Sequence, residues 1–427
     1  MKKTRHGSGS NPVDAAPSAG LAPITRRQFG KVAAAFGLHA AYTGYALILR
    51  DGEVATLDRV VEKALGIEKA AAQNPPKFKL RHGTTMAKTN EEIMKYGLWY
   101  FADEVAKRTN GEVQIELVGG GALCGELTCS QRVASKVLDI GTNSSQNGAP
   151  TFPYYNVLDY AFLWPSRASL FHFLYSPQSE KIFRKTVRDL YGIEWLWTHV
   201  ELRNVFMGLK YKDRPLVTKP EDIRGAKLRM TGSQMGRIAL TQFGANPVPV
   251  AWEETLEGLK SGLIDGQETW TSAAASFGMG PVTSQEVWVE FFSGLGHTYT
   301  RTDVLDRLPA AHREAVREAA FATQQYTQQN NEESLVKNIG IGQLNAPAST
   351  VWGKNGVRQS ILTPAQRQVW VDMASPEKNP KAWEEWRDKL TKLAKYDAYP
   401  DLHKIAREIP ADMAATAVKP RRWWKET

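Results

Sequence analysis

Short segments in which hydrophobic and polar residues alternate are separated along the chain by segments with a helical period. Alternation predicts strands at residues 78–80, 113–117 and 138–141. Between them, apolar residues spaced three to four apart predict helices over residues 89–109 and 131–137. A strand, helix, strand, helix, strand order in so short a stretch is typical of a parallel α/β sheet.

The same order of elements occurs a second time, between residues 215 and 267. Two α/β units of similar layout predict two lobes, so the fold class is α/β. After residue 308 the pattern is helical, with one long helix over residues 313–335 and another that begins at Thr363-Pro364, because proline is favoured at the first helical position. The second unit is predicted to contain strands at 227–230, 248–250 and 263–265 and helices at 233–243 and 252–260.

The start of the chain has the pattern of a targeting segment. Residues 25–31 read TRRQFGK, and residues 32–49 follow without a charged side chain. A pair of arginines, here Arg26 and Arg27, before an apolar segment is typical of twin-arginine signals, which direct folded proteins out of the cytoplasm. A plain membrane anchor is the alternative, because 18 uncharged residues are close to the shortest helix that spans a bilayer.

Cleavage of this signal is predicted at residues 70–72, which are three alanines. They lie well beyond the apolar segment, and residues 51–69 between them have the pattern of a helix. Either the signal has a long tail or the protein stays tethered, so residues 1–72 are interpreted as a signal or tether region. Lipid attachment at a cysteine near the signal is excluded, because the two cysteines are Cys124 and Cys129.

The composition is that of a globular protein. Of the 427 residues, 42% are hydrophobic and 23% are charged, and the mean hydropathy is −0.39. These values exclude a largely disordered chain and a transporter with many membrane spans. The net charge of +9 includes contributions from both ends of the chain. Nucleic-acid-binding domains gather their cations on one face, so the charge does not favour a nucleic-acid partner.

Cys124 and Cys129 are predicted to form a disulfide. An exported protein meets an oxidising compartment, where paired cysteines are oxidised. The bond would close a short loop and stabilise the turn after Gly121. A redox-active pair is the alternative, although such pairs usually have two residues between the cysteines, whereas here there are four.

No complete catalytic or cofactor-binding motif occurs in the sequence. The chain lacks the nucleophile elbow of α/β-hydrolases, the phosphate loop of NTPases, the dinucleotide-binding glycine motif and the HExxH motif of zinc proteases. Its eight histidines include no pair at metal-ligand spacing. We therefore predict no catalytic set, no metal and no cofactor.

Three segments of the second unit carry a resemblance to a known family. They are residues 220–230 (PEDIRGAKLRM), 244–250 (GANPVPV) and 259–268 (LKSGLIDGQE). In order and spacing they resemble the substrate-binding proteins of TRAP (tripartite ATP-independent periplasmic) transporters. The resemblance implies a two-lobed periplasmic receptor that closes like a flytrap on a small organic carboxylate and delivers it to TRAP-type membrane permease subunits.

This architecture divides the chain into lobes. Residues 77–203 are expected to form the first α/β lobe, completed by about 287–335. Residues 204–286 form the second, completed by about 336–400, with a hinge between the lobes and helices near the C-terminus. Residues 401–427 are expected to be a basic C-terminal tail.

In the family, an arginine at the end of a short strand anchors the ligand's carboxylate, and Arg229 matches that position. A planar guanidinium can bind a carboxylate through two parallel hydrogen bonds. Many members have a second basic residue upstream, for which Arg203 and Lys210 are both candidates. The family often has an asparagine after the DGQE segment, whereas this chain has Thr269, whose hydroxyl offers one donor where the amide gives two.

The first lobe is expected to contribute polar side chains from the loops at residues 82–88 and 142–146, at the carboxyl ends of strands, where open α/β sheets bind ligands. Thirteen tryptophans, Trp252 and Trp270 among them, indicate an apolar or aromatic part of the ligand, although most of them must lie in the core. The predicted binding residues are Arg229, Thr269, Trp270, Glu268, Arg203, Lys210, Thr84, Thr85, Ser145 and Gln146.

Two other functions stay open at this point. An exported hydrolase-like enzyme could use Asp265, Glu268 and a histidine as acid and base, but the lack of a nucleophile and base set argues against it. A membrane-tethered sensor subunit is favoured if residues 1–72 remain attached. The sequence is best explained by a receptor that is not an enzyme.

Overall fold

The computed structural model describes residues 47–48, 54–55 and 75–425. The chain divides into two units, Met1–Ala71 and Ala72–Thr427. In the first unit, β1 (Leu47–Ile48) pairs antiparallel with β2 (Val54–Ala55). The helix predicted over residues 51–69 is wrong at β2, whose backbone pairs with β1. The rest of that helix and the arginine pair of the signal lie outside the described residues.

The first lobe of the second unit contains the three strands that alternation predicted. The strands are parallel in the order β4, β3, β5, with β3 in the middle. In β4, buried and exposed residues alternate along the first half of the strand, which is why the alternation of hydrophobic and polar residues predicted it. The elements of this part are β3 (Phe78–Thr84), α3 (Lys88–Met94), α4 (Leu98–Arg108), β4 (Val113–Val118), α5 (Cys129–Ala134), β5 (Ile140–Ser144) and α6 (Ser145–Gly148).

The single helix predicted over residues 89–109 is wrong, because the structure has two helices there. Lys95 follows the last residue of α3, and Gly97 precedes α4; both residues have positive φ, 51° and 94°. Glycine adopts this left-handed conformation without a steric penalty, so Gly97 permits the sharp turn between the helices. The turn carries Tyr96, which is fully buried and stacks on His199 with ring centres 4.8 Å apart.

The second lobe repeats this arrangement, with parallel strands in the order β8, β7, β9. The strand predicted at residues 263–265 is wrong in its position along the chain, because β9 begins only at Gly266. Gly262 ends α10 in the left-handed conformation, with φ 74°, and three more residues are needed to bring the chain back to the sheet. The elements are β7 (Lys227–Met230), α9 (Gln234–Gln242), β8 (Asn246–Pro249), α10 (Thr255–Ser261), β9 (Gly266–Thr269) and α11 (Thr271–Ser276).

Two long strands that the sequence pattern did not predict join the lobes. β6 (Ile193–Gly208) and β10 (Thr283–Arg301) pair antiparallel along their length, with a register shift between Val287 and Phe292. β5 pairs with β10 and β9 with β6, so a nine-stranded sheet passes through both lobes. The predicted lobe boundaries, after residues 203 and 286, fall inside these strands.

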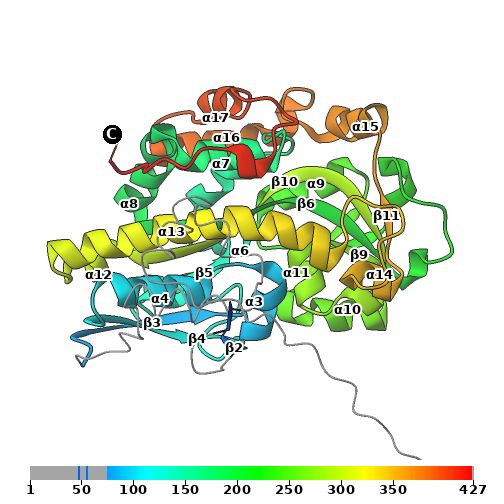
Figure 1. Ribbon diagram of the computed structural model, residues 1–427. Coiled ribbons are helices and arrows are strands. Elements are labelled where there is room, and N and C mark those ends of the chain that lie inside the picture. Colours follow the sequence, from blue (N-terminus) through cyan, green and yellow to red (C-terminus); the bar gives the residue numbers. More distant parts are fainter. Residues whose placement is uncertain (1–46, 49–53, 56–74, 426–427) are drawn as a thin grey trace, which may run out of the picture. The chain divides into compact units, whose positions relative to one another are not determined.

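Helices complete the unit, and α13 runs across it between the first-lobe strands and the C-terminal helices (Figure 1). Of residues 401–425, predicted to be a tail, the first belong to α17 and the last pack against α13: Gln328 donates to the carbonyls of Ala415 and Val418, and the side chains of Arg422 and Lys425 pair with Glu318. Within the described residues, no helix is both long and apolar enough to span a bilayer. The remaining elements are α7 (Arg167–Tyr175), α8 (Lys185–Tyr191), α12 (Thr302–Asp306), α13 (Ala310–Ser334), α14 (Val351–Asn355), β11 (Arg358–Ser360), α15 (Pro364–Ala374), α16 (Pro380–Ala394) and α17 (Tyr399–Ile405), with short 3-10 or π-helical turns at Pro153–Leu158, Ser179–Arg184, Leu209–Tyr211, Pro220–Ile223, Trp252–Glu254, Gly280–Val282, Leu335–Ile339 and Ala415–Ala417.

Adding a methyl group to Gly296 is expected to destabilise the protein. Gly296 lies in β10, and a Cβ atom there would overlap the ring of Tyr96. Overpacking of this kind typically costs about 1–3 kcal/mol. We expect Gly296→Ala to lower the free energy of unfolding, measured by urea denaturation. Gly236→Ala in α9 is the matched control, because its Cβ would have no neighbour closer than 3.9 Å; equal stability of the two variants would contradict the packing described.

Candidate functional site

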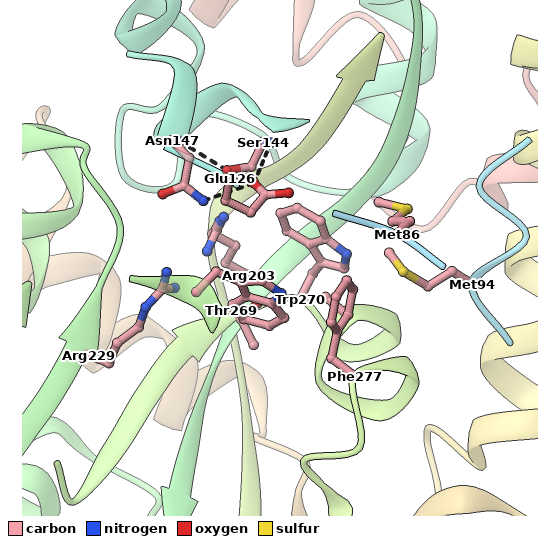
Figure 2. A pocket seen from close by; sticks show the side chains of 12 residues that line it. Met86, Met94, Glu126, Ser144, Asn147, Arg203, Arg229, Thr269, Trp270 and Phe277 are labelled. Carbon is pink, nitrogen blue, oxygen red and sulfur yellow. Dashed lines mark hydrogen bonds between the residues drawn. The ribbon is translucent and has the colours of Figure 1, made fainter. Parts of the chain in front are cut away.

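A cleft lies where the first lobe, β6 and the second lobe meet. One side is apolar and sulfur-rich, and the opposite side holds two arginines (Figure 2). Residues from widely separated segments therefore converge on one space. The lining residues are Met86, Met94, Glu126, Ser144 and Asn147 from the first lobe, Arg203 from β6, and Arg229, Trp252, Thr269, Trp270, Ala273 and Phe277 from the second lobe.

Arg203 and Glu268 form a buried ion pair at the base of the cleft. Nη1 of Arg203 lies 2.6 Å from Oε2 of Glu268, and the side chains are 2% and 0% exposed. Glu268 also accepts a hydrogen bond from the backbone N–H of Thr231, at 3.1 Å. The Arg203 guanidinium stacks over the ring of Trp270, 4.8 Å from its centre, and Nε finds no partner among the described residues.

Arg229, at the end of β7, has fewer partners than Arg203. Its Nε donates to the carbonyl of Val250 at 3.0 Å, and its guanidinium lies 5.3 Å from the ring centre of Trp252. The described part of the chain offers no hydrogen-bond partner to its Nη2. Burial lowers the pKa of Arg229 to about 10, and the charge of Glu268 opposes that shift. Arg229 therefore stays cationic at neutral pH, with an N–H group available for an anion.

The first lobe brings a carboxylate, Glu126, to the same space (Figure 2). It accepts hydrogen bonds from the backbone N–H of Ser144 at 3.1 Å, from the amide of Asn147 at 3.1 Å and from the hydroxyl of Thr85 at 2.9 Å. Burial raises the pKa of Glu126 above its usual value, and these hydrogen bonds offset only part of the rise. Because three donors point at one carboxylate, its position in the cleft is fixed.

Glu126 lies in a loop closed by a disulfide between Cys124 and Cys129. The backbone N–H of Glu126 donates to the carboxylate of Glu253, in the second lobe, at 2.8 Å. Gln146 accepts from the hydroxyl of Thr231 at 2.9 Å in a second contact between the lobes. The two lobes therefore touch directly beside the cleft.

The predicted binding residues fall into two groups. Arg203, Arg229, Thr269 and Trp270 line the cleft, and Glu268 lies directly behind Arg203. The rest do not line it. Thr85 and Gln146 make hydrogen bonds beside it. Thr84 and Ser145 are buried and lie within two residues of a lining residue in the sequence.

Lys210 is the predicted residue that the structure places elsewhere. It lies in the turn after β6, where its ammonium pairs with Asp265 at 2.9 Å and its side chain is 57% exposed. Of the two candidates for a second cation, the structure brings only Arg203 to the cleft. Asp265 and Glu268, the acid and base of the hydrolase alternative, are each paired with a different cation.

Sequence reasoning missed much of the lining from the first lobe. Glu126 lies between the two cysteines, a position that was interpreted only as part of a short disulfide loop. Of the tryptophans, Trp252 and Trp270 line the cleft, whereas Trp195 and Trp197 belong to the core. In the described residues, no group of three or more His, Cys, Asp or Glu side chains is arranged to hold a metal ion. The residues missed are Met86, Met94, Glu126, Ser144, Asn147, Ala273 and Phe277.

Comparison with known proteins assigns the chain to a family. Residues 84–380, well over half of the chain, match the family described as bacterial extracellular solute-binding protein, family 7 (DctP). The chain belongs to that family. The family consists of binding proteins, and membership implies that this family 7 protein acts outside the cytoplasm, in the periplasm.

The 2,3-diketo-L-gulonate-binding periplasmic protein YiaO of Escherichia coli is 29% identical over 170 residues, which cover 39% of this chain and 49% of that protein. This family 7 protein spans about half the length of such curated relatives. Two crystal structures have a similar fold. One is a TRAP solute-binding protein from Bordetella bronchispeptica, described with pantoate; its TM-score is 0.64 at 20% identity, and the match covers 78% of this chain and 99% of that chain. The other is the sugar acid binding protein DctPAm from Advenella mimigardefordensis with galactonate; its TM-score is 0.63 at 19% identity, and the match covers 78% of this chain and 99% of that chain. The two-lobed fold of these proteins is therefore that of this chain.

Removing one partner of the buried ion pair is expected to destabilise the family 7 protein. Arg203→Ala leaves the carboxylate of Glu268 buried without its cation, a change that typically costs about 3–5 kcal/mol. Urea denaturation without ligand measures the loss. Replacing both partners, Arg203→Met with Glu268→Gln, should restore much of the stability, because no buried charge is then left unpaired. An Arg203→Ala variant as stable as the wild type would mean that the pair does not form.

Proposed function

We propose that this protein is an extracytoplasmic solute receptor that binds a small organic carboxylate in the cleft between its lobes. The observation that carries the proposal is the pair of buried guanidiniums, Arg203 and Arg229, each with an N–H group that lacks a partner among the described residues and each lining the cleft. A buried donor without an acceptor is costly, and a carboxylate oxygen satisfies it with a charge-assisted hydrogen bond.

The relatives support this class of ligand. The names of the three proteins above mention diketogulonate, pantoate and galactonate, each of which carries one carboxylate. We propose Arg229 as the main anchor, because its guanidinium has no described carboxylate partner, whereas Arg203 is already paired with Glu268. Thr269 and Trp270 complete the polar and aromatic walls beside it.

Delivery to TRAP-type membrane permease subunits completes the proposed function. It rests on the family and on the similar structures, which are those of TRAP solute-binding proteins. The protein binds its ligand and releases it unchanged. A thermal-shift screen over organic acids tests this point when product formation is followed in parallel: a receptor is stabilised by its ligand through mass action, and turnover of any acid would refute the proposal.

Export by the twin-arginine route is expected to depend on Arg26 and Arg27. Replacing both with lysine keeps the charge but removes the motif that the export receptor reads. We expect the double variant to remain in the cytoplasm as the precursor, as measured by cell fractionation and immunoblotting. Mass spectrometry of the exported wild type then locates the new N-terminus, expected near Gln73. Normal export of the double variant would refute the twin-arginine assignment.

Removing Arg229 is expected to weaken ligand binding strongly. A carboxylate that loses its cation in a closed cleft typically costs about 2–5 kcal/mol, which is on the order of thirty- to several-thousand-fold in Kd. Arg229→Lys should recover part of the affinity, because an ammonium cannot make two parallel hydrogen bonds. Calorimetric titration of the acid found by the screen measures both variants.

The matched control for this experiment is Arg237→Ala. Arg237 is an exposed arginine of the same lobe, in α9, and it does not line the cleft. Its loss should leave the affinity unchanged, and circular dichroism should show that all three variants are folded. Unchanged affinity in a folded Arg229→Ala variant would mean that the anchor lies elsewhere, with Arg203 the next residue to test.

A further inference from the structure

The cleft contains as many carboxylates as guanidiniums. Arg203 and Arg229 are matched by Glu268, which pairs with Arg203, and by Glu126, which lines the cleft from the first lobe. A third carboxylate, that of Glu253, lies outside the lining and contacts the backbone of Glu126. A ligand that offered only a carboxylate would therefore enter a space with no excess of positive charge.

Glu126 is built as a fixed hydrogen-bond acceptor. Thr85, Ser144 and Asn147 each donate to it, so three of the roughly four lone-pair positions of its carboxylate are occupied. Donors of this kind favour the ionised form, and they act against burial, which favours the protonated form. The carboxylate keeps room for one more donor, and Figure 2 shows it pointing toward the space that Arg203 also faces.

The wall on the other side of the cleft is apolar. Met86 and Met94 from the first lobe lie on the same side as Phe277 from the second lobe (Figure 2), Ala273 also lines the cleft, and none of these side chains carries a charge. Methionine side chains adapt to irregular shapes and contact aromatic rings favourably. This wall suits the hydrocarbon part of a small ligand.

We infer that the cleft selects organic acids that carry a hydrogen-bond donor, a hydroxyl or an ammonium group, close to their carboxylate group, and that Glu126 accepts the hydrogen bond from this donor. The inference rests on the proposed function and deepens it. Arg229 and Arg203 receive the carboxylate of the ligand, Glu126 accepts its donor, and the methionine wall contacts its hydrocarbon part. A plain fatty or aryl acid leaves Glu126 facing an anion with nothing to donate to it.

Matched sets of acids with one skeleton test this selectivity. Isovalerate, α-hydroxyisovalerate and valine form one set, and hydrocinnamate, phenyllactate and phenylalanine form another. We expect the donor-bearing members to bind the wild type at least about tenfold more tightly than the plain acid, because a hydrogen bond to a charged group is worth that much or more. Calorimetric titration measures each Kd. Any acid found by the screen is compared with its deoxy analogue in the same way.

The variant Glu126→Gln removes the charge and should reduce the preference to about threefold or less, since a neutral acceptor is weaker and no longer repels a plain acid. Glu253→Gln is the matched control. It removes a nearby charge on an exposed side chain that does not line the cleft, and its amide oxygen can still accept from the backbone of Glu126. The preference should survive in this control.

The outcomes separate the two proposals. Plain and donor-bearing acids that bind the wild type equally well would overturn the role of Glu126 while the receptor function stands. A preference that survives in folded Glu126→Gln would assign it to another residue and would also overturn the inference. Failure of every carboxylate to bind the wild type would refute the proposed function itself. If Glu126→Gln does not fold, the comparison within the wild type still decides whether the donor is required.

Discussion

The antiparallel pairing of β6 with β10 is the constraint on which the rest of the structure depends. Both strands run through both lobes. β5 of the first lobe is positioned by its pairing with β10, and β9 of the second lobe by its pairing with β6. Arg203 lies on β6 opposite Phe292, where the register between the long strands shifts. The next pairings set Asn204 beside Thr269 and Val205 beside Glu268. The buried ion pair and the wall of the cleft therefore follow from one strand register.

The sequence revealed short strands that either alternate between buried and exposed residues or lie between recognisable turns. β4 and β7 lie where alternation or flanking turns predicted them. β6 was missed because all of its residues are buried, and a strand covered on both faces has no alternation to detect. The single helix predicted over residues 89–109 was wrong for a different reason. The helical spacing of apolar residues persists across Gly97, although the backbone turns there.

A residue of the candidate site could be predicted from the sequence where its role depends only on its position in its own strand. Arg229 matched the family's anchor position, but the choice between Arg203 and Lys210 depends on where β6 ends. Arg203 lies inside the strand and faces Glu268, whereas Lys210 follows the strand's end and reaches the surface. Glu126 could not be predicted, because its place in the cleft depends on how its disulfide loop meets β5 and α6, and no local pattern records that contact.

A receptor must stay folded when no ligand is bound, and this requirement limits how the cleft can attract an anion. Buried guanidiniums are costly unless they are compensated, and Glu268 compensates Arg203 directly. Every carboxylate that stabilises the empty cleft also repels an anionic ligand. The attraction must therefore come from directed N–H groups, Nε of Arg203 and Nη2 of Arg229, which have no partner in the described part of the chain. Binding through directed donors depends on the shape of the ligand more than on its charge, which is the physical basis of the selectivity that we propose.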